Sequence, residues 1–279
     1  MKTILITLCS LLMVGNSLYS QNQKRQFEIS SNSVKGEVYP IEIVLPDEYD
    51  STRVYPILYF TDWWFSAQAG PQLYSRMRFA GEMDPIIIVG IGTKGDMNDW
   101  RSERWRDLTP TNLPEFDMPD PKEDGSRGIS GGAESFLDFI KDELIPLVES
   151  KYPSDTLNRG FFGYSLGGLF GAYVLSTEPQ LFQKYFLGSP TLRYDDFVIV
   201  DRLREASPDM YSSVKAIFIS VGEEESGDYL KGFADFRDLM IKKEVPRLDV
   251  KSYIVIGEGH LLSSTPAIIK GLKYLYNPK

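Results

Sequence analysis

The sequence predicts an α/β fold, with a doubly wound and mostly parallel sheet of about eight strands and helices on both faces. Three apolar runs that do not alternate with polar residues support this prediction: YPILYF at 55–60, PIIIVGI at 85–91 and KAIFISV at 215–221. Uninterrupted β-branched and aromatic runs are typical of strands covered on both faces, and such strands form parallel sheets. Helical patterns lie between them, so strand and helix alternate along the chain.

An antiparallel edge pair is predicted before the first of these runs. Between residues 24 and 45 apolar and polar side chains alternate, as Ile41, Ile43 and Leu45 show. A period of two is typical of strands that have one face in solvent. Further strands are expected at 160–162, 185–188 and 250–256, which brings the total to about eight.

Helices are predicted at 133–152, 229–243 and 266–276, and after the strand at 160–162. The longest places Phe136, Phe139, Ile140 and Leu144 on one stripe, and Pro146 is expected to bend it. Residues 94–132 are instead rich in Asp, Pro, Gly, Arg and Trp, and they predict one long irregular segment of the kind that forms a lid. We therefore expect a single domain over 21–279 with a lid-like insertion around 94–132.

Residues 1–20 have the layout of a secretory signal peptide. Lys2 precedes an apolar run at 4–14 that is too short to span a bilayer, and small and polar residues follow it. Cys9, the only cysteine, lies in this segment, so the mature chain would hold no thiol for a disulfide or for catalysis. We expect a secreted or periplasmic protein with no stable membrane insertion after cleavage.

The charge and the residue types argue against several classes of partner. The formal net charge is −9 at pH 7, which disfavours nucleic acid and anionic lipid as main partners. One histidine and no mature cysteine disfavour a metal centre. The sequence carries neither a dinucleotide nor a P-loop fingerprint, so no cofactor is expected.

The stretch RGFFGYSLGG at 159–168 contains the pattern Gly-x-Ser-x-Gly around Ser165. In a nucleophile elbow a strand turns sharply into a helix and holds this serine in a strained conformation, with its hydroxyl clear of the sheet. Gly163 and Gly167 let strand and helix pass closely because they carry no Cβ. The pattern is short enough to arise by chance, and the alternative is an ordinary glycine-rich turn.

His260 is the candidate base for Ser165, because a serine hydroxyl is a poor nucleophile until a base removes its proton. It is the only histidine, and it follows a predicted strand downstream of the serine. An acid between the two is needed to orient the imidazole, and Glu223, Glu224 and Glu225 directly follow the strand predicted at 215–221. The spacing does not choose among these three.

Several further motifs occur along the chain together with the elbow. They are ILYFTD at 57–62, RDLTP at 106–110, GGAESFL at 131–137, GSPTL at 188–192, GEEE at 222–225 and GEGH at 257–260. In this order they resemble the putative-esterase family of α/β-hydrolases, which holds siderophore esterases of the enterochelin type, feruloyl esterases, esterase D and the mycolyltransferases. The resemblance covers nearly the whole chain after residue 20 and implies an α/β-hydrolase fold with serine esterase activity.

The resemblance also implies roles for the candidate residues. Ser165 would attack an ester carbonyl, His260 would carry the proton, and Glu225 would orient His260, with Glu223 as the alternative acid.

An oxyanion hole is expected from two backbone N–H groups, those of Leu166 and Trp64. Relatives usually have Asp-Gly before the second donor, and this chain has Asp62-Trp63 instead.

The candidate substrate contacts are Trp63, Arg101, Arg104 and Arg193. A tryptophan could stack on a sugar or aryl group and an arginine could hold an anionic group, whereas core packing and pairing with nearby acids are the alternatives. We expect hydrolysis through an acyl-enzyme of a small-molecule or glycan-linked ester, such as acyl or feruloyl esters of polysaccharides or siderophore esters. The alternatives are an acyltransferase with the same residues and a non-catalytic carbohydrate-binding protein on the same fold.

Overall fold

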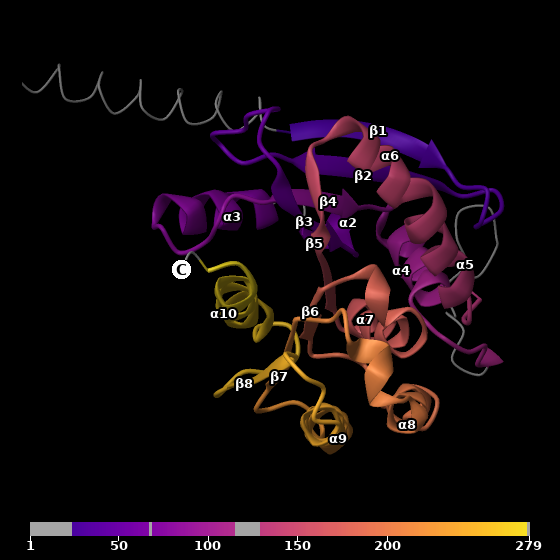
Figure 1. Ribbon diagram of the computed structural model, residues 1–279. Coiled ribbons are helices and arrows are strands. Elements are labelled where there is room, and N and C mark those ends of the chain that lie inside the picture. Colours follow the sequence, from indigo (N-terminus) through magenta and orange to yellow (C-terminus); the bar gives the residue numbers. More distant parts are fainter. Residues whose placement is uncertain (1–23, 67–68, 115–128, 278–279) are drawn as a thin grey trace, which may run out of the picture.

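The computed structural model describes residues 24–66, 69–114 and 129–277. These residues form one eight-stranded sheet in the order β1-β2-β4-β3-β5-β6-β7-β8 (Figure 1). The signal peptide expected at 1–20 lies outside the described residues. Within the described ranges, no helix is both long and apolar enough to cross a membrane.

The strands occupy the stretches that the apolar runs predicted. Their bounds are Lys24–Ser30 (β1), Val38–Val44 (β2), Tyr55–Phe60 (β3), Ile87–Ile91 (β4), Ser154–Tyr164 (β5), Lys184–Gly188 (β6), Ala216–Gly222 (β7) and Asp249–Val255 (β8). Strands β1 and β2 pair in antiparallel fashion, as do β2 and β4, and all other neighbours are parallel. The predicted mostly parallel sheet with an antiparallel edge pair is confirmed.

Helices cover both faces of the sheet, and each face has its own core. Along β3, Ile57 and Tyr59 face one cluster of buried side chains, whereas Leu58 and Phe60 face the other. The first cluster packs under α4 (Met97–Asp107), α5 (Ala133–Asp138), α6 (Ile145–Lys151), α7 (Leu166–Thr177), α8 (Val198–Glu205) and α9 (Gly227–Lys242). The second packs under α2 (Trp63–Ser66), α3 (Gly70–Phe79) and α10 (Ser264–Tyr276). Burial on both sides explains why the central strands are apolar throughout.

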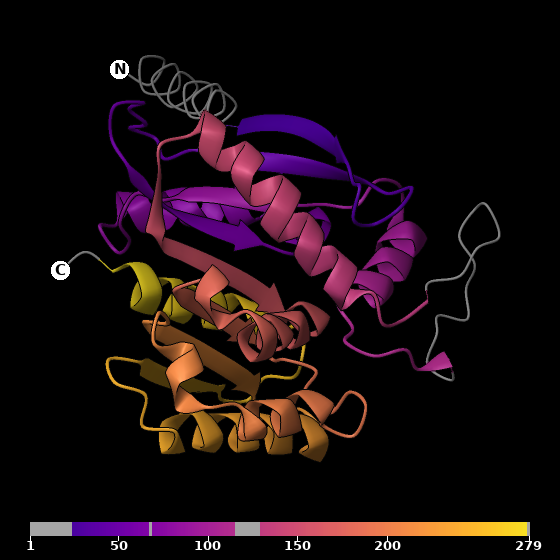
Figure 2. The same cartoon turned by 45° about the vertical axis from the view of Figure 1, so that its right-hand side comes forward.

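The helix predicted at 133–152 is a rod of three helical pieces. A π-helical segment, η2 (Phe139–Leu144), joins α5 to α6, and Pro146 lies in the first turn of α6. Proline has no N–H to donate to the preceding turn, and the rod changes from π-helical to α-helical geometry directly before Pro146. Figure 2 shows the rod crossing the face of the sheet.

Residues 94–132 are not wholly irregular, and the expectation of one long irregular segment is wrong for its first third. Residues 97–107 form α4, which Asp96 caps by accepting hydrogen bonds from the N–H groups of Asn98 and Asp99. The Asp99 side chain accepts in return from the Asp96 N–H, which completes a capping box. Residues 115–128 of the expected insertion lie outside the described part of the chain.

The carboxyl ends of β3, β5, β6, β7 and β8 lie along one edge of the sheet, because these strands are parallel. Ligand sites of open α/β sheets form at this edge. The loops that leave it carry Asp62, Ser165, Ser189, Glu225 and His260.

Candidate active site

Ser165 occupies a sharp turn between β5 and α7. Its backbone has φ 58° and ψ −118°, a left-handed conformation that a residue with a Cβ adopts only under strain. A Cβ on Gly163 would lie 2.0 Å from the carbonyl oxygen of Gly167, so a side chain at 163 would collide with the start of α7. The Ser165 N–H donates to the carbonyl of Gly188 at 2.8 Å, which fixes the turn to β6. This backbone has the geometry expected of a nucleophile elbow rather than of an ordinary glycine-rich turn.

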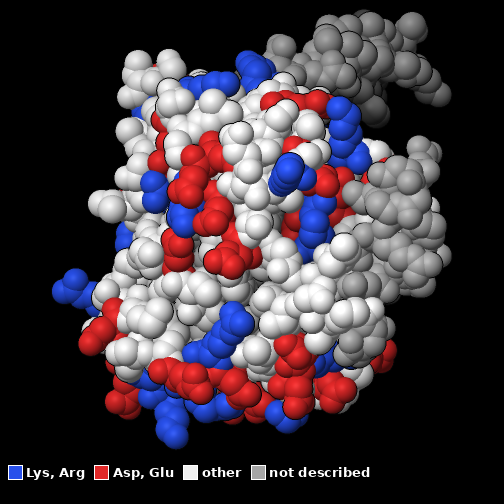
Figure 3. Space-filling view, turned by 90° about the vertical axis from the view of Figure 1, so that its right-hand side faces the viewer, with Lys and Arg blue, Asp and Glu red and all other residues white. Residues whose placement is uncertain are grey.

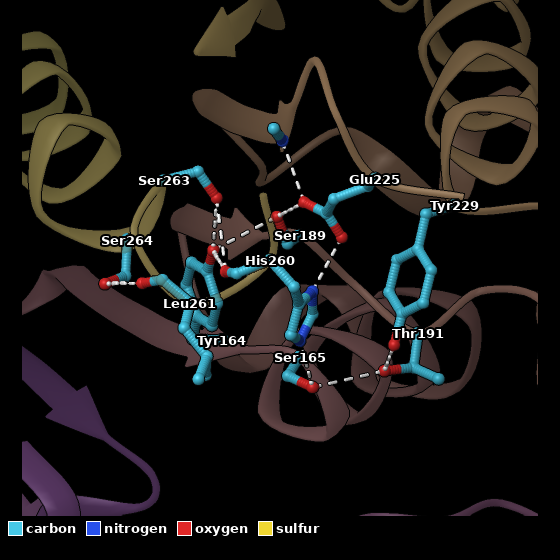
Figure 4. Close-up of polar contacts among 11 residues, drawn as sticks. Tyr164, Ser165, Ser189, Thr191, Glu225, Tyr229, His260, Leu261, Ser263 and Ser264 are labelled. Atoms are coloured by element: carbon cyan, nitrogen blue, oxygen red, sulfur yellow. Dashed lines mark hydrogen bonds and ion pairs between the residues drawn. The ribbon is translucent and has the colours of Figure 1, made fainter. Parts of the chain in front are cut away.

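Ser165, His260 and Glu225 form one hydrogen-bonded chain (Figure 4). The Ser165 Oγ lies 2.9 Å from the His260 Nε2, and the His260 Nδ1 lies 2.6 Å from the Glu225 Oε2. The three residues follow β5, β8 and β7, so the parallel sheet brings together positions that are far apart in sequence. A base within hydrogen-bond reach of a serine and held by a carboxylate has the geometry of a catalytic triad.

Of the three glutamates after β7, only Glu225 reaches His260. Glu225 is buried, whereas Glu223 and Glu224 are exposed. The Glu223 carboxylate accepts the N–H of Gly257 at 2.8 Å instead, and so holds the start of the loop that carries His260. The position that the resemblance favoured is therefore the one that the structure places beside the imidazole.

The Glu225 carboxylate is surrounded by donors. Its Oε1 accepts the Ser189 hydroxyl at 2.5 Å and the Gly222 N–H at 2.8 Å. Burial by itself would raise the pKa of Glu225, but the hydrogen bonds from His260, Ser189 and Gly222 outweigh it and hold this pKa below its ordinary value. The acid therefore stays ionised, and it can stabilise a positive charge on His260.

The Tyr164 side chain holds the loop that carries His260. Its hydroxyl donates to the His260 carbonyl oxygen at 2.5 Å and also lies 2.8 Å from the Ser263 Oγ and 3.2 Å from the Ser189 Oγ. Burial raises the pKa of Tyr164, so the hydroxyl keeps its proton. Sequence reasoning did not predict this contact. The only signal was position, because Tyr164 is the variable residue before the elbow serine and Ser189 lies in the GSPTL stretch.

A second hydroxyl pair lies on the other side of Ser165. The Thr191 Oγ1 is 3.4 Å from the Ser165 Oγ and 3.2 Å from the Tyr229 hydroxyl. The Tyr229 ring lies 4.9 Å from the His260 ring, and the guanidinium of Arg193 lies over Tyr229 at 5.4 Å from its centroid. The structure thus places Arg193 one aromatic ring away from the candidate base.

The two expected oxyanion donors lie at the N-terminal ends of helices. Leu166 is the first residue of α7 and Trp64 is the second residue of α2. N–H groups in the first turn of a helix have no partner within that helix and point outward from its end. A Cβ on Gly167 would lie 2.7 Å from the Thr61 Oγ1 and 3.3 Å from the Asp62 Oδ2, so the residues that lead into α2 touch the elbow.

Trp63 is a core residue, and the expectation that it contacts substrate is wrong. It is only 3% exposed, and its ring packs edge-on against Phe60 at 5.2 Å. A Cβ on Gly90 would lie 2.2 Å from the Trp63 ring, which shows that the ring sits directly on the backbone of β4. Trp63 therefore fixes α2 to the sheet.

The two arginines of α4 differ in their surroundings. Arg104 is bound through two nitrogens to Asp62, at 2.9 and 3.0 Å, and it stacks over Trp100 at 4.7 Å. Its charge is therefore already paired, which weakens its expected role as an anion site. Arg101 is exposed on the same helix.

Charged side chains of both signs are interspersed over the face shown in Figure 3. Among the residues that the structure describes, no three His, Cys, Asp or Glu side chains are grouped so that they could hold a metal ion.

Comparison with known proteins gives consistent matches. The sequence model of the family described as Putative esterase matches residues 31–227. The ferri-bacillibactin esterase BesA of Bacillus subtilis (strain 168) is 33% identical over 180 residues, which are 61% of this chain and 59% of that protein. The siderophore triacetylfusarinine C esterase of Aspergillus fumigatus is 30% identical over 175 residues, 60% of this chain and 56% of that protein. The chain thus spans less than two thirds of the length of these two curated relatives.

The fold is also found in solved structures. A crystal structure of the BES protein from Bacillus cereus superposes with a TM-score of 0.78 at 26% identity, and the match covers 91% of this chain and 96% of that one. The similarity supports the α/β-hydrolase fold that the sequence predicted.

Proposed function

The chain belongs to the Putative esterase family, and on that premise we propose that it is a carboxylic ester hydrolase with Ser165 as its nucleophile. One observation supports this proposal above all others, the continuous hydrogen-bonded chain from the Ser165 hydroxyl through His260 to the buried Glu225. A serine held in a strained elbow gains reactivity only if a base is within reach, and here it is.

Acylation uses the three residues in turn. The Ser165 Oγ attacks the ester carbonyl carbon while its proton passes to the His260 Nε2, and Glu225 stabilises the imidazolium that forms. When the tetrahedral intermediate collapses, the bond to the alkoxy oxygen breaks and His260 returns the proton to that oxygen. The alcohol leaves, and the acyl group remains on Ser165.

Deacylation repeats the steps with water. A water molecule attacks the acyl carbonyl, His260 takes one of its protons, and Ser165 receives that proton as the carboxylic acid leaves. In both steps His260 accepts a proton at Nε2 and later returns it, so the base is regenerated at the end of each cycle.

The oxyanion of each intermediate would be held by the backbone N–H groups of Leu166 and Trp64. Loss of one such donor typically costs about 2.7–4 kcal/mol of transition-state stabilisation. Both donors belong to the backbone, so alanine substitution at either position does not remove them.

The names of the relatives suggest siderophore esters as the substrate class. Two matched proteins carry names that describe siderophore ester cleavage, although this chain spans only 59% and 56% of their length. We extend this substrate class to the present chain as part of the proposal. Residues 1–20 have the layout of a secretory signal peptide. We therefore also propose that the ester is hydrolysed outside the cytoplasm.

A panel of esters tests the activity. Aryl acetates, acetylated xylan, a feruloyl ester and a catecholate siderophore lactone would be incubated with the parent protein and with Ser165→Ala. We expect hydrolysis of at least one ester by the parent and none by the variant. Glycan binding that is equal in both proteins, with no ester cleaved by either, would instead favour the non-catalytic alternative.

A further inference from the structure

Three aromatic side chains form a shelf beside the elbow: Trp64 and Phe65 from α2, and Trp100 from α4. The Trp64 and Trp100 rings lie 5.7 Å apart at 22°, and the Phe65 and Trp100 rings lie 5.9 Å apart at 19°. The Trp100 ring thus lies nearly parallel to each of the other two rings. Phe65 is 62% exposed, so its ring is open to solvent and can be reached by a ligand.

The shelf is held rigidly, and the anchor is Asp62. This carboxylate accepts the Trp100 Nε1–H at 3.1 Å and binds the Arg104 guanidinium through two further hydrogen bonds. Arg104 in turn stacks on the Trp100 ring. Because the ring nitrogen and one face of Trp100 are already engaged, this side chain has little conformational freedom to lose when a ligand stacks on it. The entropic cost of binding is therefore small.

Trp63 sets the direction in which the shelf faces. Its ring is buried on the backbone of Gly90, so α2 is pinned to β4. With Trp63 turned into the core, the neighbouring Phe65 is left exposed at the surface.

The shelf adjoins the candidate nucleophile. Asp62, which anchors the Trp100 ring, also lies against Gly167, two residues after Ser165. Trp64 carries in its backbone the proposed oxyanion donor and in its side chain one ring of the shelf. This shared residue links the shelf to the proposed oxyanion hole, so one ester molecule is the ligand to test at both places.

The charges of the shelf select the kind of ligand. The guanidinium of Arg104, which stacks on Trp100, is neutralised by Asp62. Recognition here consequently relies on ring stacking rather than on attraction of an anion.

We propose that Trp64, Phe65 and Trp100 form a subsite for a planar aromatic ring of the ester substrate. The inference rests on the proposed function, since it assigns the ring to the ester that Ser165 cleaves. The ring can belong to the alcohol or to the acyl part of the ester, and the experiment separates the two.

Phe65→Leu is the test variant, because it keeps an apolar side chain of similar reach and removes the ring at an exposed position. Phe65→Tyr keeps the ring. Phe79→Leu is the matched control, since Phe79 is 96% exposed at the end of α3 and belongs to neither the shelf nor the elbow.

Each protein is assayed on two pairs of esters: phenyl acetate with cyclohexyl acetate, and methyl benzoate with methyl cyclohexanecarboxylate. The measured quantity is the ratio of kcat/KM for the aromatic ester to that for its saturated partner. We expect Phe65→Leu to lower this ratio about 2- to 12-fold in one pair, from the usual worth of an aromatic pair. Phe65→Tyr and Phe79→Leu should keep the parental ratio. An unchanged ratio in both pairs, or an equal fall in the Phe79 variant, would overturn the proposal.

A binding measurement separates failure of the shelf from failure of the proposed activity. Tryptophan fluorescence of Ser165→Ala, with and without Phe65→Leu, is titrated with the same four esters. A preference for the aromatic esters that depends on Phe65, in a protein whose parent cleaves no ester, would keep the subsite and refute the hydrolase. Ester cleavage that requires Ser165, without such a preference, would keep the hydrolase and refute the subsite.

Discussion

Replacing Tyr164 by phenylalanine removes one hydroxyl that holds the loop of His260. The change leaves the ring in place, and the groups that lose a partner keep another. The His260 carbonyl still accepts the Ser263 hydroxyl at 3.2 Å, and the Ser189 hydroxyl still donates to Glu225. We therefore expect a loss of only about 1 kcal/mol in the free energy of unfolding, the usual net worth of one neutral hydrogen bond.

The effect on catalysis should be larger than the effect on stability. The hydroxyl binds the backbone of His260, the proposed base, so its loss should let the imidazole drift from its 2.9 Å contact with Ser165. A displacement of about 1 Å can cost a factor of about 100 in rate, and we expect kcat to fall about 10- to 100-fold. KM should change little, because Tyr164 contacts the loop rather than the substrate.

The assay is steady-state hydrolysis of an aryl acetate together with urea denaturation, and Tyr276→Phe is the matched control. The Tyr276 hydroxyl is also buried, but it has no hydrogen-bond partner among the described residues, so its removal should leave kcat close to that of the parent and should not lower the free energy of unfolding. An unchanged kcat in Tyr164→Phe, or a rise in KM at constant kcat, would refute the positioning role.

Three further predictions follow from the same geometry. Glu225→Gln should lower kcat and make the free energy of unfolding less dependent on pH in the acid range. The pKa of Glu225 is lower in the folded than in the unfolded protein. The stabilisation by its carboxylate is therefore complete above the unfolded pKa and is lost as the pH falls through the folded pKa. Urea denaturation at several acid pH values should show the gap between parent and variant closing as pH falls, and a constant gap would contradict this. The free energy of unfolding should be about 1 kcal/mol higher for Ser165→Gly than for Ser165→Ala, because glycine relieves the backbone strain at φ 58°. Equal free energies of unfolding would contradict the strain. Trp63→Ala should cost about 3–5 kcal/mol in the free energy of unfolding, and a loss below 1 kcal/mol would show that the ring does not anchor α2.

The fold could be predicted because the local signal and the buried environment agree. The run at 55–60 is apolar on both faces since Ile57 and Leu58 lie in different cores, and that requirement is visible in the sequence. The helix at 97–107 escaped prediction because its residues are mostly charged and only its cap at Asp96 marks its start. A helix that carries polar side chains around most of its surface gives no hydrophobic period to detect.

The candidate site could be predicted only in part. The three positions of the candidate triad follow strand ends, and strand ends are visible in the sequence as the limits of apolar runs. Trp63 was misassigned because composition cannot say whether a tryptophan faces the core or a ligand. The Trp63 ring is buried because Gly90, on strand β4, has no side chain and leaves room for it. The contact of Tyr164 with His260 is likewise set by the approach of two loops that are distant in sequence.

Covalent labelling tests directly whether Ser165 is the nucleophile. The folded protein would be treated with a fluorophosphonate, digested, and its peptides analysed by mass spectrometry while ester hydrolysis is followed in parallel. We expect one label per chain, on Ser165, with activity lost in proportion to labelling and with no label in His260→Ala. Ester hydrolysis that continues while Ser165 remains unlabelled, or a label on another residue, would contradict it.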